Sequence, residues 1–260
     1  MPLPSGPAPD LPPPYRVVAF DCDSTLSAIE GIDELARLAG QDVRALTERA
    51  MRGEITLESV YGARLELVRP TRAMLDEVGA LYVARRLPHA RELVLALKAL
   101  GKRVCAVSGG LETAVRALAR AAGIADEDVF AVPIRFDARG AYEGFDEANP
   151  LARSGGKIEV ARALGAPLAF VGDGVTDLEV AEAGACARFV AFGGVARRRE
   201  VLARAAVRCA VPDLAALLPL LCSPAELETL ARSADHAALV AAARRAGEGP
   251  PSRAPRGKEA

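Results

Sequence analysis

Two aspartates, Asp21 and Asp23, follow a short apolar run and are the first residues in the chain whose types and spacing could do chemistry. The run, residues 17–20, is rich in β-favouring side chains and is typical of a strand buried on both faces. In an open α/β sheet, ligands bind just beyond the carboxyl ends of the strands. Two carboxylates there repel each other unless a cation or a proton lies between them. This stretch alone indicates an ion site or a polar helix cap equally well.

Three later stretches place further polar residues where other strands are expected to end. Ser108 and Gly109 follow a second apolar run, and Asp173 follows a third. Lys157 begins a helix just before that third run, in a chain with only four lysines, and Asp177 lies in the helix after it. Each stretch has an ordinary structural interpretation when taken singly. Together they assemble acids, a lysine, a hydroxyl and glycine backbone at one edge of a parallel sheet, which favours an anion held through a divalent metal.

Phosphoryl transfer requires such a set of groups. A carboxylate can approach a negative phosphoryl group only where its charge is offset, and Mg²⁺ held by hard oxygen ligands offsets it. Asp21 and Asp173 would supply side-chain ligands, with a backbone carbonyl completing the protein's share. Asp23 would protonate the leaving oxygen and then deprotonate the attacking water. The remaining candidates would contact or position the phosphoryl group: Ser108 and the Gly109 N–H as hydrogen-bond donors, Lys157 as a compact positive charge, and Asp177 as the group that orients Lys157 or a bound water.

The elements that must position these residues follow from apolar periodicity and turn residues. Strands that alternate with helices of about ten residues predict a parallel sheet with right-handed crossovers, a Rossmann-like α/β core. The expected strands after the first are 103–107, 168–171, 188–192 and 206–211. The expected helices are 90–100, 111–122, 156–164, 175–183, 196–204 and 213–221. Residues 129–136 and 141–145 flank the turn residues 137–140 and predict a β-hairpin.

Four expected helices follow the first strand with no strand between them, at 33–39, 42–52, 57–68 and 72–84. They predict a small helical cap inserted after that strand. Arg64 falls on the apolar face of the third helix, where a guanidinium must reach solvent or a carboxylate. Glu30 lies near Asp23 at the start of this region. A cation and an anion facing the site suit an α-amino acid, with its carboxylate at Arg64 and its ammonium at Glu30, although ordinary solvated charges explain them equally well.

The predicted domain organisation combines these elements with the composition of the termini. We expect a disordered proline-rich tail at 1–14, an α/β core at 15–27 and 88–222, a helical cap at 28–87, and a helical extension with a disordered end at 223–260.

Bulk composition excludes several function classes. A formal net charge of −1 over 260 residues does not favour nucleic acid or a membrane surface as a partner. The apolar runs are too short to cross a bilayer. The five scattered cysteines indicate reduced thiols, and hence a cytoplasmic protein. Neither His89 nor His236 has a metal-ligand spacing. The sequence does not distinguish a monomer from a homodimer.

Six motifs resemble, in order and spacing, those of the haloacid dehalogenase (HAD) superfamily of aspartyl-phosphate phosphatases, and within it the phosphoserine phosphatase family. The resemblance covers roughly residues 15–221, most of the chain, and the motifs are FDCDST (20–25), EGIDELA (30–36), SGG (108–110), SGGK (154–157), GDGVTDLE (172–179) and FGG (192–194). The resemblance implies Mg²⁺-dependent hydrolysis of O-phospho-L-serine to serine and phosphate, the last step of a serine pathway. Leu57 departs from the pattern, because members of the family often carry an aromatic residue there.

The resemblance also implies roles for individual residues. Asp21 would be the nucleophile that forms an aspartyl-phosphate, and Asp23 the general acid/base whose main-chain carbonyl binds Mg²⁺ beside Asp21 and Asp173. The implied substrate contacts are Ser108, Gly109, Lys157 and Thr176 at the phosphoserine, with Glu30 and Arg64 holding its serine moiety.

Three alternatives remain open at this point. Ser108 lies in a sequence one residue away from a G-x-S-x-G nucleophile elbow, but an α/β-hydrolase would need His236 as its base and would leave Asp21 and Lys157 unused. A phosphate sensor phosphorylated on Asp21 is disfavoured by Asp23, which would speed loss of the phosphoryl group. A phosphotransferase, or a phosphatase for another small phosphomonoester, would use the same residues.

Overall fold

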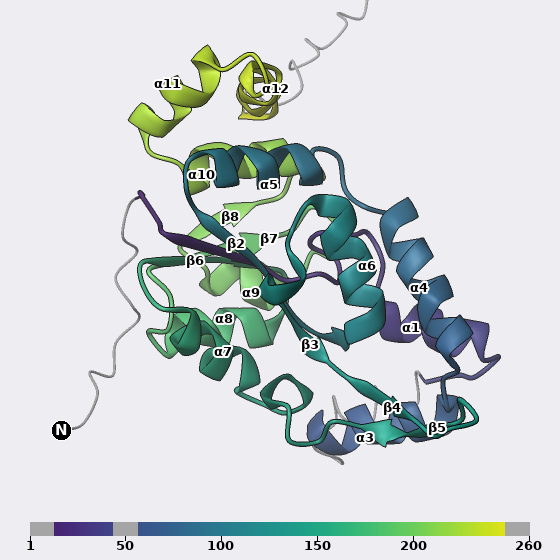
Figure 1. Cartoon of the computed structure of the whole chain (residues 1–260). Helices are drawn as coiled ribbons and strands as arrows, with labels where there is room; N and C mark the ends of the chain where they lie inside the picture. The colour runs from purple at the N-terminus through teal and green to yellow at the C-terminus, as the bar shows by residue number, and fades with distance from the viewer. Residues whose placement is uncertain (1–12, 44–56, 248–260) are drawn as a thin grey trace, which may run out of the picture.

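The computed structural model describes residues 13–43 and 57–247, except that the side chains of residues 57–59 are not described. A six-stranded sheet lies at its centre in the order β3-β2-β1-β6-β7-β8, and every neighbouring pair is parallel (Figure 1). The strands are β1 (Val17–Phe20), β2 (Arg103–Leu111), β3 (Val129–Val132), β6 (Leu168–Gly172), β7 (Arg188–Phe192) and β8 (Val207–Cys209). The expected parallel α/β core is confirmed.

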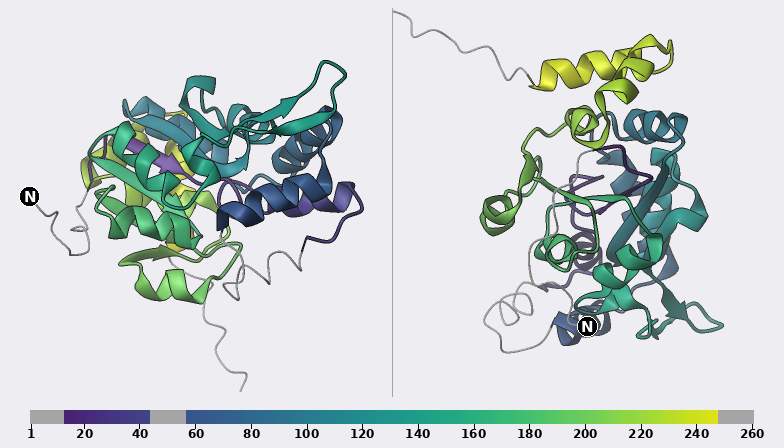
Figure 2. Two further views of the ribbon diagram at one scale, coloured as in Figure 1. Left: turned by 90° about the horizontal axis from the view of Figure 1, so that it is seen from below. Right: turned by 90° about the vertical axis from the view of Figure 1, so that its left-hand side faces the viewer.

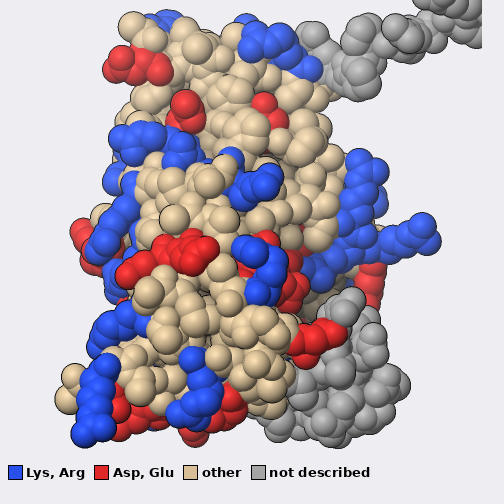
Figure 3. Space-filling model, turned by 90° about the vertical axis from the view of Figure 1, so that its right-hand side faces the viewer, with Lys and Arg blue, Asp and Glu red and all other residues tan. Residues whose placement is uncertain are grey.

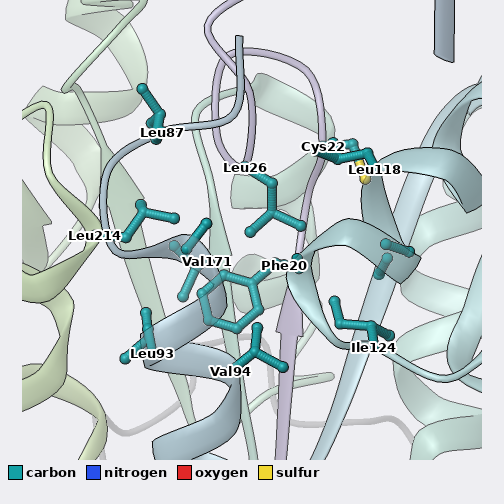
Figure 4. Close-up of a cluster of buried hydrophobic side chains, with 14 of the residues drawn as sticks. Phe20, Cys22, Leu26, Leu87, Leu93, Val94, Leu118, Ile124, Val171 and Leu214 are labelled. Carbon is teal, nitrogen blue, oxygen red and sulfur yellow. The ribbon is translucent and has the colours of Figure 1, made fainter. Parts of the chain in front are cut away.

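Strand β1 lies between β2 and β6 and is buried on both faces, as its apolar run predicted. Val18 and Phe20 point into one hydrophobic cluster, whereas Val17 and Ala19 point into another, because successive side chains of a strand alternate. Figure 4 shows Phe20 packed among side chains from several elements on its face of the sheet.

Helices cover both faces of the sheet and close these two clusters (Figures 1 and 2). One face is covered by α5 (Ala90–Ala99), α6 (Glu112–Ala122), the 3₁₀ turn Leu214–Leu217 and α10 (Leu218–Leu221). The other is covered by α7 (Gly156–Leu164), α8 (Val175–Glu182) and α9 (Arg199–Arg204).

The expected single strand over residues 129–136 is wrong. β3 ends at Val132, and a separate strand β4 (Ile134–Phe136) pairs antiparallel with β5 (Tyr142–Phe145) in a two-stranded hairpin. Pro133 separates the two strands, and a proline has no N–H to continue a hydrogen-bonded ladder. One apolar run therefore serves two sheets.

Other boundaries differ from the expectation by less. β2 continues past Val107 with a shifted register, so Ser108 lies in the extension of the strand and not in a loop. The expected helix 213–221 is a 3₁₀ turn followed by the single turn α10, in which Pro219 lacks an N–H. The expected helix 196–204 begins only at Arg199. The expected helix 42–52 extends beyond the described residues.

Three described helices lie in the expected cap region, 28–87, namely α1 (Gly31–Leu38), α3 (Leu57–Val68) and α4 (Arg72–Ala84). α4 packs against both α1 and α6, and the α4–α6 approach is close. A Cβ added at Gly79 would lie 3.0 Å from the Cβ of Ala117. α4 thus joins the hydrophobic cluster of the core, while α3 lies beside the β4–β5 hairpin (Figure 1). The division into core and cap remains a prediction.

Two further helices, α11 (Pro224–Arg232) and α12 (Ala237–Gly247), follow α10. Figures 1 and 2 show them at the end of the molecule opposite α3 and the hairpin. Acidic and basic side chains are intermixed on the face that carries α4 (Figure 3). Within residues 13–43 and 57–247, no helix is both long and apolar enough to span a bilayer.

Candidate active site

The two strands that precede Asp21 and Asp173, β1 and β6, are neighbours in the sheet. Phe20 of β1 lies opposite Val171 of β6, and the N–H of Asp21 donates to the Val171 carbonyl at 2.9 Å. Asp21 and Asp173 each follow directly after their strand, so the parallel register places both carboxylates at the same edge. Both side chains are buried there.

Lys157 reaches this edge from the first turn of α7. Its Nζ lies 2.7 Å from Oδ1 of Asp21 and 2.5 Å from Oδ1 of Asp177. Burial disfavours the charged lysine, but the two carboxylates, Asp177 above all, raise its pKa and keep it an ammonium. Glycine before Lys157 is required by packing, because a Cβ at Gly156 would lie 1.7 Å from the Pro150 carbonyl oxygen. The SGGK motif thus seats α7 tightly enough for its lysine to reach the acids.

Asp21, Asp173 and Asp177 form a buried acidic group that fits a metal ion. One carboxylate oxygen from each lies within 4.8 Å of the others. Burial raises the pKa of Asp173 to about 6, and a bound cation would favour its ionised form. Hard carboxylate oxygens are the ligands that Mg²⁺ prefers. In Asp177, however, Oδ1 contacts Lys157 and Oδ2 accepts the Gly174 N–H at 2.9 Å, so this residue caps α8 and orients Lys157.

Asp23 projects from the loop after Asp21 and is held by two donors on one oxygen. Its Oδ1 accepts the Gly31 N–H at 2.7 Å and the Tyr82 hydroxyl at 2.5 Å. Burial, with a smaller contribution from the charge of Glu30, raises the pKa of Asp23 to about 6. A carboxyl group with a pKa near 6 can both give and take a proton near neutral pH.

The predicted pair for an amino acid reaches the same cavity from different elements. Arg64 lines the cavity from α3, beside Val60 and Tyr61, and Glu30 lines it from the residue preceding α1. Burial lowers the pKa of Arg64, and the nearby Asp33 and Glu30 oppose that effect. The side chain of Leu57 lies outside the described residues.

Arg198 is a site residue that the sequence analysis missed. Its Nε lies 2.7 Å from Oδ2 of Asp173, and its Nη2 lies 3.0 Å from Oε1 of Glu30, which also accepts the Ser24 hydroxyl at 2.7 Å. Arg198 lies between β7 and α9, again beyond the carboxyl end of a strand. The available signal was the run of three arginines at 197–199, but periodicity could not show which of them points inward.

These side chains surround a cavity of about 300 Å³. Its lining also includes Thr176 at the start of α8 and the backbone of Gly109 and Gly110 at the end of β2. Ser108 is fully buried next to the cavity, where its hydroxyl accepts the Gly110 N–H at 3.0 Å. The cavity lining thus contains every predicted site residue except Ser108.

Two tyrosines near the site were also missed, because helical periodicity indicated ordinary core positions. Tyr82 contacts Asp23 from the last turn of α4. Tyr61 lines the cavity, and its ring packs edge-on against Phe145 of the hairpin, with centroids 5.2 Å apart. Burial, together with the charge of Asp23, raises the pKa of Tyr82 well above its usual value, so the phenol stays protonated.

Comparison with known proteins places this site in a family. A family model described as haloacid dehalogenase-like hydrolase matches residues 15–184. A chloroplastic phosphoserine phosphatase from Arabidopsis thaliana is 37% identical over 78% of this chain and 71% of its own length. The chain belongs to the phosphoserine phosphatase branch of the HAD-like hydrolases. The Homo sapiens phosphoserine phosphatase is also 37% identical, over 71% of this chain and 84% of its own length.

Solved structures show the same HAD-like fold. A phospho-aspartyl intermediate analogue of phosphoserine phosphatase superposes with a TM-score of 0.63 and 25% identity, covering 80% of this chain and 99% of its own. A phosphoserine phosphohydrolase-like protein from Francisella tularensis gives a TM-score of 0.67 at 24% identity, covering 83% and 99%. The fold class expected from the motifs is therefore confirmed.

The positions of Ser108 and His236 argue against the alternative in which Ser108 is the nucleophile. Ser108 accepts a hydrogen bond from Gly110 beside the cavity. His236 immediately precedes α12, which Figures 1 and 2 show at the end of the molecule opposite α3 and the hairpin. A Ser-His pair therefore has no geometric basis here.

Proposed function

We propose that this protein is a Mg²⁺-dependent phosphatase that hydrolyses O-phospho-L-serine to L-serine and phosphate through an aspartyl-phosphate, in L-serine biosynthesis. The observation that carries the proposal is the buried ammonium of Lys157, which lies 2.7 Å from Asp21 at the edge of the sheet where Asp173 also follows its strand. A carboxylate whose charge is offset in this way can approach a phosphoryl group. The relatives named phosphoserine phosphatase support the choice of substrate.

The residues for a magnesium site are Asp21 and Asp173, with the main-chain carbonyl of Asp23. The buried acidic group supports this assignment, since its oxygens are hard ligands close to one another. When bound, Mg²⁺ would offset negative charge on the nucleophile and the phosphoryl oxygens.

The first half-reaction uses the two acids of the loop after β1. A carboxylate oxygen of Asp21 attacks phosphorus, the bond from phosphorus to the serine oxygen breaks, and Asp23 gives its proton to that oxygen. Lys157 stabilises negative charge on the phosphoryl oxygens, and the Gly109 N–H, the Ser108 hydroxyl and Thr176 are proposed to donate hydrogen bonds to them.

The second half-reaction reverses the role of Asp23. Its carboxylate takes a proton from water, and the water oxygen attacks the phosphorus of the aspartyl-phosphate. The bond between phosphorus and the Asp21 oxygen breaks and phosphate leaves, which regenerates both carboxyl groups in their starting states. Asp177 keeps Lys157 directed at the site throughout.

The charges at the mouth of the cavity support an α-amino acid as the leaving group. We propose that Arg64 binds the substrate carboxylate and that Glu30 binds its ammonium. Arg198 already contacts Glu30, so the ammonium would share that carboxylate or displace the guanidinium.

A phosphate-release screen over small phosphomonoesters, with and without Mg²⁺, tests reaction, metal and substrate together. We expect O-phosphoserine to be the best substrate and EDTA to abolish turnover. Asp21→Asn should abolish turnover, because an amide is a poor nucleophile. Asp23→Asn should slow turnover by about 10²-fold or more and let phosphoenzyme accumulate, as seen by acid-quench trapping.

Other outcomes would identify the alternatives. Preference for another phosphomonoester, or transfer to an added alcohol instead of water, would replace phosphoserine hydrolysis with a related activity. A long-lived phosphoenzyme in the unaltered protein would favour a sensor. Full activity of Asp21→Asn would contradict the mechanism itself.

The proposal also includes the cellular location and the oligomeric state of the protein. A cytoplasmic location is supported by the five cysteines, which are all buried and form no disulfide. A small-molecule substrate makes either a monomer or a homodimer sufficient, and light scattering of the purified protein distinguishes them.

A further inference from the structure

A tyrosine outside the predicted site makes the shortest contact to the proposed general acid. Tyr82 is fully buried at the end of α4, and its hydroxyl lies 2.5 Å from Oδ1 of Asp23. The Gly31 N–H reaches the same oxygen at 2.7 Å. Two donors on one carboxyl oxygen define which way the group faces.

The second oxygen of Asp23, Oδ2, accepts no hydrogen bond from the described residues, and Asp23 itself belongs to the cavity lining. A protonated carboxyl group carries its proton on one oxygen, and an oxygen that already accepts two hydrogen bonds is the poorer place for it. Oδ2 is therefore the oxygen that can present a proton to the cavity.

Glycine at position 31 belongs to the same arrangement. A Cβ built on Gly31 would lie 2.2 Å from the Tyr82 hydroxyl oxygen. Any side chain there would push the phenol away from Asp23. The glycine therefore supplies a donor N–H and also leaves room for the second donor.

We propose that Tyr82 is a positioning residue for catalysis, which with the Gly31 N–H holds Oδ1 of Asp23 as the accepting oxygen and directs Oδ2 at the leaving-group oxygen of the substrate. The inference rests on the proposed function, because it assigns to Asp23 the proton transfer described there. Tyr82 acts through Asp23, and the described residues that line the cavity do not include it.

The consequence depends on the leaving group. Serine leaves as an alcohol and needs a proton, whereas acetate leaves acetyl phosphate without one. Both substrates are small and would give their phosphoryl group to Asp21, so both form the same aspartyl-phosphate. A misdirected Asp23 should thus slow formation of the intermediate from O-phosphoserine and spare its formation from acetyl phosphate.

The test is kcat/KM for both substrates, measured on one preparation of each variant so that the fraction of folded enzyme cancels in the ratio. Tyr82→Phe removes one oxygen and should lower kcat/KM for O-phosphoserine about tenfold, a part of the roughly 10²–10⁴-fold that a positioned acid contributes. For acetyl phosphate we expect less than a twofold change. Gly31→Ala, which displaces the phenol without altering it, should show the same selective loss.

Tyr142→Phe is the matched control. The Tyr142 hydroxyl is also buried, has no hydrogen-bond partner among the described residues, and lies on the hairpin strand β5. Its loss should change neither substrate more than twofold. An equal loss for both substrates in Tyr82→Phe, or no loss for either, would overturn the proposal.

Failure of the proposed function gives a different pattern. If Asp23→Asn lowers kcat/KM equally for both substrates, Asp23 is not the acid and the inference falls with that role. If Asp23→Asn lowers kcat/KM only for O-phosphoserine while Tyr82→Phe and Gly31→Ala lower kcat/KM for neither substrate, the proposed function stands and only the role of Tyr82 is wrong.

Discussion

At the scale of single residues, charge in a confined space decides what the site can do. Lys157 lies between Asp21 and Asp177 with its side chain only 10% exposed, so its ammonium has little water to compete with the two carboxylates. A compact ammonium fits between them, whereas a planar guanidinium needs more space and presents its donors in a fixed fork. This geometry explains a lysine in a chain whose basic residues are otherwise mostly arginine.

Arg64 provides the residue-scale test of substrate recognition. Arg64→Ala removes the cation proposed to bind the substrate carboxylate. We expect KM for O-phosphoserine to rise about tenfold or more, because a charge-assisted hydrogen bond is worth about 1.5–3 kcal/mol. KM for an aryl phosphate that lacks both amino-acid charges should change little. The measurement is steady-state kinetics with both substrates.

Arg72→Ala is the control for that experiment. Arg72 begins α4 and stacks over the Phe136 ring at 4.5 Å, without lining the cavity. Its loss should leave KM for O-phosphoserine unchanged. An equal rise in KM for both substrates in Arg64→Ala would show that the arginine supports the cavity and does not recognise the carboxylate.

At the scale of elements, helices that begin at the carboxyl edge of the sheet place the side chains of their first turns at the site. α7 delivers Lys157 and α8 delivers Thr176 and Asp177 in this way. α4 contributes differently, because its close packing on α6 at Gly79 fixes the end that carries Tyr82. The β4–β5 hairpin also supports the cavity, since its Phe145 packs against Tyr61 of α3, which lines the cavity.

The helical extension offers an element-scale prediction about stability. Lys102, with a side chain 2% exposed, donates to the Tyr15 carbonyl at 3.0 Å and contacts Glu226 of α11 at 2.5 Å. Lys102→Met would leave the partly buried Glu226 carboxylate without its ion-pair partner. We expect a loss of about 3 kcal/mol and a melting temperature lower by on the order of 5–10 °C, with kcat unchanged at 20 °C.

A second substitution checks that mechanism. Adding Glu226→Leu to Lys102→Met removes the unpaired charge and should restore part of the melting temperature, measured by differential scanning calorimetry. A double variant that is no more stable than Lys102→Met would mean that packing of the lysine stem, and not the charge, holds the extension in place.

At the scale of the whole molecule, the fold buries several carboxylates at one edge of the sheet, and the nearby cations neutralise their charge only in part. Asp173 follows its strand into a buried position, with Arg198 as its ion-pair partner. Burial raises the pKa of Asp173 to about 6, which means that ionising it at neutral pH costs stability in the metal-free protein. A bound dication would recover that cost.

The stability of the molecule should therefore respond to Mg²⁺ in a pH-dependent way. Below pH 6 a proton occupies Asp173, whereas above pH 6 the carboxylate is ionised and available to the metal. We expect 10 mM Mg²⁺ to raise the melting temperature by several degrees at pH 7.5 and by much less at pH 5, since ligand stabilisation is about 2.7 kcal/mol at 100 times Kd. Thermal unfolding with and without Mg²⁺ measures this shift.

Asp173→Asn is the control, because it removes the titrating carboxylate and should abolish most of the shift at both pH values. An equal Mg²⁺-induced shift at pH 5 and pH 7.5 in the unaltered protein would contradict the assignment of Asp173 as a metal ligand.

Local signals in the sequence were sufficient for most of the fold. The expected helices 57–68 and 72–84 match α3 and α4, because their apolar spacing and flanking residues act locally. The apolar run at 129–136 was misassigned, since a run of β-favouring residues does not reveal that Pro133 divides it between two sheets. Pairing partners of strands lie far apart in the sequence and are settled only on folding.

The same distinction applies to the site. Strand ends followed by acids or glycine determined where Asp21, Asp173 and Gly109 would lie, because parallel strands share one carboxyl edge. Tyr82 and Arg198 carried no such local mark. Their roles follow from contacts across 59 and 25 residues, to Asp23 and Asp173 respectively, and only packing in three dimensions creates those contacts.

The sequence by itself determined the chemistry available to this protein, because motif residues at the ends of strands need only the sheet to bring them together. Tertiary structure decided which oxygen of Asp23 is held by Tyr82 and which arginine reaches Asp173. The physical reason is that a side chain's partner depends on the relative position of whole elements, and helical or strand periodicity reports only on the element in which a residue lies.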